Sequence, residues 1–171
     1  MQKDKVPFLS VIDSYKELQE ELDQAINRAM NSGAYIESEE TQAFEEEFAT
    51  YCGAKYCIGV GNGLDALHLI LKAYKIGKGD EVIVPANTFI ATWLAVTYSG
   101  AVPVPVEPDP LTYNINPDLI KKAITPRTRA IIPVHLYGQP ADMNEITHIA
   151  QEYQIKIIED SAQAHGAKYA G

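Results

Sequence analysis

The most informative stretch for predicting the fold is Tyr56-Cys57-Ile58-Gly59-Val60-Gly61-Asn62-Gly63-Leu64-Asp65-Ala66-Leu67, in which an apolar run leads through a glycine turn into an amphipathic segment. The run 56–60 predicts a strand, and residues 65–74 predict a helix. A helix N-terminus after such a turn offers free backbone N–H groups and the positive end of the helix dipole to an anion. The stretch therefore predicts a strand–helix unit and a binding site for a phosphate group.

The same alternation of strand and helix continues to the end of the chain. The predicted strands are 56–60, 81–84, 102–106, 130–134 and 155–158, and the predicted helices are 65–74, 90–98, 117–124 and 143–153. Short apolar strands separated by helices are typical of a mainly parallel sheet with helices on both faces. The expected fold class is therefore α/β, with ligands bound at the carboxyl ends of the strands.

Two helices are predicted before this alternating region. They cover 15–30 and 38–51, and each is followed by a glycine that suits the end of a helix, Gly33 and Gly53. We therefore expect an N-terminal helical segment, residues 1–54, followed by the sheet-containing domain, residues 55–171.

Composition narrows the class of protein. The 171 residues carry a net charge of -9, which argues against a nucleic-acid partner. No apolar run approaches the roughly 20 residues that cross a membrane, and the polar residues 1–6 do not resemble a signal peptide. Cys52 and Cys57 lack the spacing of a zinc or redox motif. We expect a cytoplasmic protein without a disulfide or a bound metal.

Polar and aromatic residues directly follow several predicted strands. The segments 61–63, 85–89, 135–140 and 160–165 should converge at one edge of a parallel sheet. Asp160 follows the last predicted strand, and a carboxylate near a pyridine nitrogen keeps that nitrogen protonated. A protonated pyridine ring withdraws electrons from a carbanion. A phosphate site and this acid together favour a phosphorylated pyridine cofactor.

Each of these residues also has a simpler interpretation. Asp160 could cap a turn, Gln163 could be a loop amide bonded to the backbone, and Phe89 could belong to the core. His135 and His165 could join Asp160 around a metal, although their separation fits no compact metal motif. Neither a dinucleotide fingerprint nor a Walker A loop is present.

Several segments together resemble the N-terminal part of the pyridoxal-phosphate-dependent sugar aminotransferases of the DegT/DnrJ/EryC1/StrS group. The resemblance covers nearly the whole chain and is carried by residues 32–36, 61–67, 79–92, 133–138 and 159–166. It implies the large domain of the aspartate-aminotransferase-like fold. It also implies a homodimer.

The resemblance implies pyridoxal 5'-phosphate as the cofactor. Asp160 would pair with the ring nitrogen, Gln163 would hold the ring oxygen, and Phe89 would stack on the ring. The phosphate would accept hydrogen bonds from a set of adjacent backbone N–H groups, those of Gly63, Leu64 and Asp65. Glu159, which precedes Asp160, is expected to face the other side of its strand and either to be structural or to support the site indirectly.

The implied reaction transfers an amino group from glutamate to a keto group of a nucleotide-linked deoxysugar, for aminodeoxysugar and polysaccharide synthesis. The version of the phosphate turn at 63–67 resembles enzymes that aminate the 3-keto position. The sequence names neither the sugar nor the nucleotide.

The family's Schiff-base lysine and small C-terminal domain have no counterpart here, and Lys168, eight residues after Asp160, does not match that lysine. We therefore expect an N-terminal fragment that cannot transaminate alone. Two alternatives stay open. One is a dehydratase of the same fold, in which histidine replaces the lysine. The other is a non-catalytic remnant that binds the cofactor or a partner.

Overall fold

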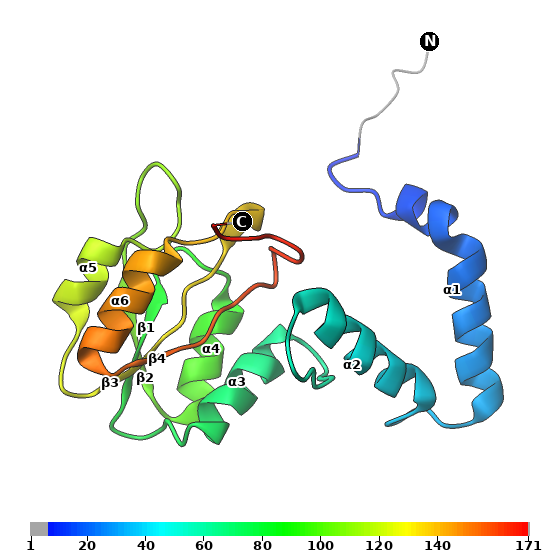
Figure 1. Ribbon diagram of the computed structural model, residues 1–171, viewed down its shortest axis with the longest axis horizontal. Helices are drawn as coiled ribbons and strands as arrows, with labels where there is room; N and C mark the ends of the chain where they lie inside the picture. The colour runs from blue at the N-terminus through cyan, green and yellow to red at the C-terminus, as the bar shows by residue number, and fades with distance from the viewer. Residues whose placement is uncertain (1–6, 171) are drawn as a thin grey trace, which may run out of the picture. The chain divides into compact units, whose positions relative to one another are not determined.

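The computed structural model describes residues 7–170, and the chain divides into two compact units, Met1–Gly59 and Val60–Gly171. The polar residues 1–6, which do not resemble a signal peptide, lie outside the described residues. The first unit contains two helices, α1 (Ile12–Ser32) and α2 (Glu39–Cys52) (Figure 1). Both end as predicted, because Gly33 and Gly53 take left-handed conformations with φ of 67° and 66°.

The two N-terminal helices differ in how they pack. Phe44 and Phe48 of α2 stack with ring centroids 5.4 Å apart, and Tyr51 continues this face. In contrast, no described residue of α1 is buried, and its apolar residues Leu22 and Ile26 are exposed. The periodicity thus predicted α1 correctly but not how much of the helix is buried.

The second unit is built on a parallel sheet of four strands in the order β2-β1-β3-β4 (Figure 1). The strands are β1 (Glu81–Pro85), β2 (Val102–Val106), β3 (Thr128–Ile131) and β4 (Lys156–Ile157). Ile83 in the middle of β1 lies opposite Val104 on one side and Ile131 on the other. The pairings between these four strands are all parallel, which confirms the fold class predicted from the sequence.

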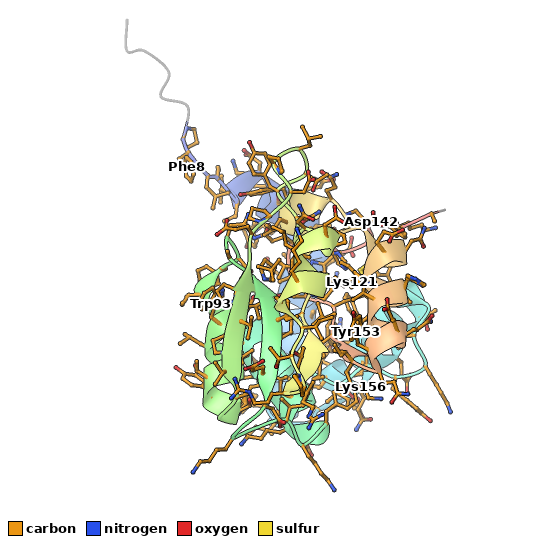
Figure 2. All side chains as sticks on the ribbon, turned by 90° about the vertical axis from the view of Figure 1, so that its left-hand side faces the viewer. Phe8, Trp93, Lys121, Asp142, Tyr153 and Lys156 are labelled. Carbon is orange, nitrogen blue, oxygen red and sulfur yellow. The ribbon has the colours of Figure 1, made fainter. Side chains whose placement is uncertain are left out.

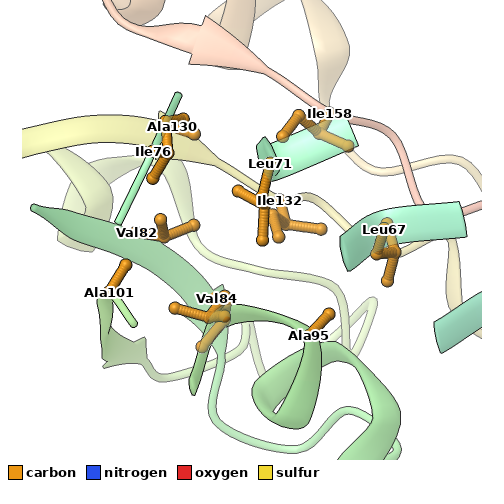
Figure 3. Packing of buried hydrophobic residues seen from close by; sticks show 11 residues of the cluster. Leu67, Leu71, Ile76, Val82, Val84, Ala95, Ala101, Ala130, Ile132 and Ile158 are labelled. Carbon is orange, nitrogen blue, oxygen red and sulfur yellow. The ribbon is translucent and has the colours of Figure 1, made fainter. Parts of the chain in front are cut away.

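Helices cover both faces of this sheet. They are α3 (Gly63–Ala73), α4 (Ile90–Ser99), α5 (Pro117–Ala123) and α6 (Met143–Tyr153), together with the short helix η1 (Leu136–Gly138). Because side chains alternate along a strand, Val82 and Val84 pack with α3 and α4 (Figure 3), whereas Ile83 packs with α5 and α6. Two hydrophobic cores therefore hold the sheet between its layers.

Side-chain contacts also join the outer helices. Lys121 of α5 pairs with Glu152 of α6 at 2.9 Å, and its ammonium group lies 5.9 Å from the ring centroid of Tyr153 (Figure 2). These groups are exposed, so the contact contributes little to stability. None of the helices in the described range 7–170 is long and apolar enough to cross a membrane.

The strand predicted at 56–60 is wrong. The segment is not a strand in the structure, and Tyr56 and Ile58 are 75% and 78% exposed. An isolated apolar run does not form a strand without a neighbour to pair with, and no described strand pairs with this segment. Cys57, within this segment, is half-buried.

Two other strands are shorter than predicted. Pro133 has no N–H to donate, which ends the ladder of β3. The pairing then resumes at an isolated parallel bridge between Val134 and Asp160. This bridge places Asp160 at the carboxyl edge of the sheet.

A buried carboxylate lies at the opposite end of the sheet. Glu81 is 6% exposed, accepts a hydrogen bond from the Thr125 hydroxyl at 2.5 Å and pairs with Arg127. The hydrogen bond from Thr125 lowers the pKa of Glu81 below its usual 4.5, Arg127 adds to this, and burial opposes it. The pair joins the start of β1 to the segment before β3.

We expect Glu81→Gln to lower the free energy of unfolding by about 1–3 kcal/mol near neutral pH, because it removes hydrogen bonds to a charged group. The pKa of Glu81 is lower in the folded protein than in the unfolded chain. The stabilisation by Glu81 is therefore complete above the unfolded-state pKa and is lost as the pH falls through the folded-state pKa. Denaturant unfolding at about pH 7 and about pH 3 measures this difference. The exposed Glu107→Gln is the control, and an equal effect of Glu81→Gln at both pH values would contradict the assignment.

Candidate functional site

A cavity of about 470 Å³ lies at the carboxyl end of the sheet in the second unit. Its walls come from the start of α3, the start of α4 and the segments that follow β3 and β4. Five of the six residues predicted for the site line it, namely Gly63, Leu64, Phe89, Asp160 and Gln163. The sheet thus brings together turns that are up to a hundred residues apart in the sequence.

The N-terminus of α3 presents two free amides to this cavity. Asn62 caps the helix, since its side-chain oxygen accepts a hydrogen bond from the Asp65 N–H at 2.9 Å. The N–H groups of Gly63 and Leu64 have no partner among the described residues, as is usual in a first helical turn. A Cβ at Gly63 would meet no atom within 4 Å. An anion can therefore approach these amides closely.

Asp65 is the sixth residue predicted for the site, and unlike the other five it does not face the cavity. Its N–H is bonded to Asn62, its carboxylate accepts a hydrogen bond from the Asn62 amide at 2.9 Å, and it does not line the cavity. In this structure Asp65 therefore completes the helix cap and has no free N–H to offer a ligand.

Asp160 is held at the cavity by its backbone and by its side chain. Its N–H donates to the Pro133 carbonyl at 2.9 Å, and its carbonyl accepts from the His135 N–H at 3.1 Å. Its Oδ1 accepts the Ala162 N–H at 3.2 Å, and its Oδ2 accepts the Thr92 hydroxyl at 3.0 Å. Asp160 thus forms a turn cap and also faces the cavity, so the two interpretations of this residue are compatible.

Gln163 is oriented by a strained turn. Its Oε1 accepts the Tyr137 N–H at 2.8 Å, which leaves the Nε2 group available as a donor. Tyr137 has a φ of 57°, a left-handed conformation that is costly for a residue with a side chain. This turn therefore supplies the backbone N–H that holds the Gln163 side chain.

Phe89 immediately precedes α4 and lines the same cavity with a side chain that is 71% exposed. An exposed aromatic ring beside a carboxylate and helix amides is suited to stacking on a planar ligand. The interpretation of Phe89 as a core residue does not fit this exposure.

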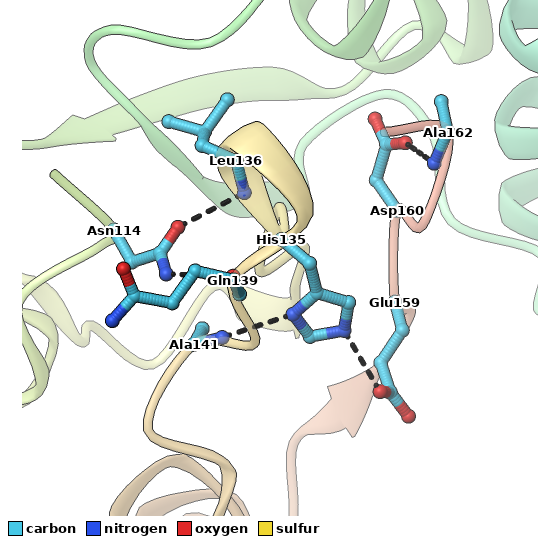
Figure 4. Close-up of polar contacts among 8 residues, drawn as sticks. All are labelled: Asn114, His135, Leu136, Gln139, Ala141, Glu159, Asp160 and Ala162. Atoms are coloured by element: carbon cyan, nitrogen blue, oxygen red, sulfur yellow. Dashed lines mark hydrogen bonds and ion pairs between the residues drawn. The ribbon is translucent and has the colours of Figure 1, made fainter. Parts of the chain in front are cut away.

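His135 and Glu159, the residue before Asp160, form a hydrogen-bonded pair next to the site (Figure 4). His135 is buried, and its Nδ1 accepts the Ala141 N–H at 3.0 Å, so a neutral ring carries its proton on Nε2. That nitrogen lies 3.0 Å from Glu159 Oε2, to which it donates. The hydrogen bond from His135 lowers the pKa of Glu159, with partial burial opposing it. Among the described residues no cluster suited to a metal ion is found.

Two contributors were not recognised from the sequence. Asn114 is 2% exposed, accepts the Leu136 N–H at 3.0 Å and donates to the Gln139 carbonyl at 2.9 Å, which holds the turn that carries Tyr137 (Figure 4). Thr92 is 1% exposed and donates to Asp160. Both contacts join distant segments, so no local motif marks them.

Comparison with known proteins assigns the family. The model of the DegT/DnrJ/EryC1/StrS aminotransferase family matches residues 16–171. The chain belongs to this family. It is 58% identical over 97% of its length to dTDP-3-amino-3,6-dideoxy-alpha-D-galactopyranose transaminase of Aneurinibacillus thermoaerophilus. It is 53% identical over 98% of its length to dTDP-3-amino-3,4,6-trideoxy-alpha-D-glucose transaminase of Streptomyces venezuelae.

Solved structures share the fold of this chain. S. venezuelae DesV, in complex with a ketimine intermediate, matches 95% of this chain with a TM-score of 0.93 and 52% identity. NtdA from Bacillus subtilis, with bound PMP, matches 100% with a TM-score of 0.92 and 40% identity. The chain spans less than half of these proteins, 46% and 44% of the two transaminases and 44% and 40% of the two solved chains.

Proposed function

We propose that this protein uses pyridoxal phosphate to transfer an amino group from glutamate to a keto group of a nucleotide-linked deoxysugar. The observation that carries the proposal is the convergence of two free helix amides, a carboxylate and an amide donor on one cavity. The two transaminases compared above are named for 3-amino sugars, which supports the 3-keto position as the site of amination. The resemblance also implies a homodimer, which we include in the proposal.

The cavity fits the chemical groups of this cofactor. A phosphate suits the N–H groups of Gly63 and Leu64 at the helix N-terminus. A planar ring suits the exposed face of Phe89, and a ring oxygen suits the free amide donor of Gln163. When bound, the cofactor supplies an electron sink for the carbon atom that gains or loses the amino group.

In this proposal Asp160 holds a proton on the ring nitrogen. Its carboxylate is fixed by Ala162 and Thr92, so it cannot rotate freely away from the cavity. A carboxylate held beside a pyridine nitrogen favours the protonated form of that nitrogen. Phe89 would keep water from one face of the cofactor ring. Gln163 would hold the orientation of the ring by donating to the ring oxygen.

We further propose that the lysine that carries the cofactor lies outside residues 1–171. No lysine within the described residues lines the cavity. A lysine supplied by another part of the protein would reach the open side of this site and move the proton at the reacting carbon. Histidine at the same position would instead indicate the dehydratase alternative.

The test uses the full-length protein loaded with pyridoxal phosphate and follows its absorption spectrum when glutamate is added. We expect conversion to the aminated form of the cofactor, with no conversion by the same concentration of glycine. Borohydride reduction of a second sample, followed by peptide mass mapping, should place the phosphopyridoxyl group on a lysine outside residues 1–171. A protein that binds the cofactor but never accepts an amino group would contradict the proposal.

A further inference from the structure

Two threonines of the cavity wall connect to Asp160 in a line. Thr88 Oγ1 lies 3.1 Å from Thr92 Oγ1, which lies 3.0 Å from Asp160 Oδ2. We infer that Thr88 and Thr92 form a hydroxyl relay that positions the Asp160 carboxylate against the ring nitrogen. This inference rests on the proposed function and assigns to Thr92 the role of a positioning residue.

The direction of the relay follows from the number of protons. An ionised carboxylate only accepts hydrogen bonds, so the single hydroxyl proton of Thr92 is used on Asp160. Thr88 must then donate its own proton to Thr92. Each bond polarises the next in such a chain, which strengthens the final bond to the carboxylate.

Thr92 differs from most helical threonines in its burial and in its hydrogen-bond partner. Threonine hydroxyls within helices usually bond to a carbonyl of the preceding turn, and Thr97 of the same helix does so, with Leu94 at 3.0 Å. Thr92 is 1% exposed and bonds instead to a residue 68 positions away. A buried hydroxyl directed at a carboxylate of the cavity wall is a specific contact between α4 and the segment after β4.

The consequence is a carboxylate fixed at both oxygens. Ala162 N–H holds Oδ1 and the Thr92 hydroxyl holds Oδ2. Each oxygen keeps a further lone pair for a donor in the cavity. Without Thr92, Oδ2 loses its protein partner and the carboxylate can rotate about its Cβ–Cγ bond, so its hold on a ring proton weakens.

The experiment measures the cofactor ring itself. Full-length protein is loaded with pyridoxamine phosphate labelled at the ring nitrogen with nitrogen-15, and the chemical shift is followed against pH. Thr92→Val removes the hydroxyl and keeps the shape, and it should lower the pKa of the ring nitrogen by about one unit, because a carboxylate that can rotate away stabilises the protonated ring less. Thr92→Ser should restore the wild-type titration. Thr97→Val, the same change on the same helix, should leave it unchanged.

The outcomes separate this inference from the proposed function. If the wild-type protein does not bind pyridoxamine phosphate, both are overturned. If it binds, and Asp160→Asn shifts the ring titration while Thr92→Val does not, the relay alone is overturned. If Thr92→Val does not fold, the relay is tested with Thr88→Val, since Thr88 is only half-buried. It should lower the ring pKa by a smaller amount, and an unchanged titration would overturn the relay.

Discussion

Asp160→Asn in the full-length protein should lower kcat by about a thousandfold while the fold and cofactor binding persist. An ion pair at about 4 Å contributes about 4 kcal/mol at an effective dielectric constant of about 20, and about 1.4 kcal/mol corresponds to a tenfold change in rate. The amide that replaces the carboxylate keeps its shape but cannot stabilise a positively charged ring nitrogen. Steady-state kinetics with glutamate and the keto sugar measure the effect.

The matched control for this prediction is Asp118→Asn, which makes the same change at an exposed position in the first turn of α5. We expect its kcat to stay within about twofold of wild type, because surface charges of this kind contribute little. Activity of Asp160→Asn equal to that of the control would mean that Asp160 serves only as a turn cap.

Asn114→Ala should lower the free energy of unfolding by about 3 kcal/mol. Its amide satisfies the Leu136 N–H and the Gln139 carbonyl in a buried position, and each buried polar group left unpaired costs about 1–3 kcal/mol. The same change loosens the turn that directs the Tyr137 N–H to Gln163. Denaturant unfolding measures the loss of stability. A higher KM for the cofactor would report the weaker binding that follows when Gln163 is no longer held.

Asn87→Ala provides the control for this second prediction. Asn87 also donates to a backbone carbonyl, that of Tyr113 at 3.0 Å, but from an exposed position where water can replace the bond. We expect a change in stability below about 0.5 kcal/mol. If both asparagine variants lose the same stability, burial does not explain the role of Asn114.

Local sequence patterns predicted most of the fold. α6 has the predicted bounds, and Gly33 and Gly53 end α1 and α2 as predicted. These features depend on residues close in sequence, which is why they could be read directly. The strand predicted at 56–60 failed because strand formation depends on a partner, and no local pattern shows whether that partner is present.

In the candidate site, too, the sequence did not show contacts between residues that are distant along the chain. Gly63, Phe89 and Gln163 line one cavity because they follow elements whose ends meet at one sheet edge, as the strand–helix pattern predicts. Thr92 could not be recognised, because its role depends on the packing of α4 against the segment after β4. The Asp65 amide was expected to be free, but the sequence does not show that Asn62 already binds it.

The most direct test of the central claim is a crystal structure of the full-length protein with pyridoxamine phosphate. We expect the phosphate to accept hydrogen bonds from the N–H groups of Gly63 and Leu64. The ring nitrogen should lie within about 3 Å of the Asp160 carboxylate, with Phe89 against the ring. A phosphate bound away from α3, or a ring nitrogen turned away from Asp160, would contradict the account.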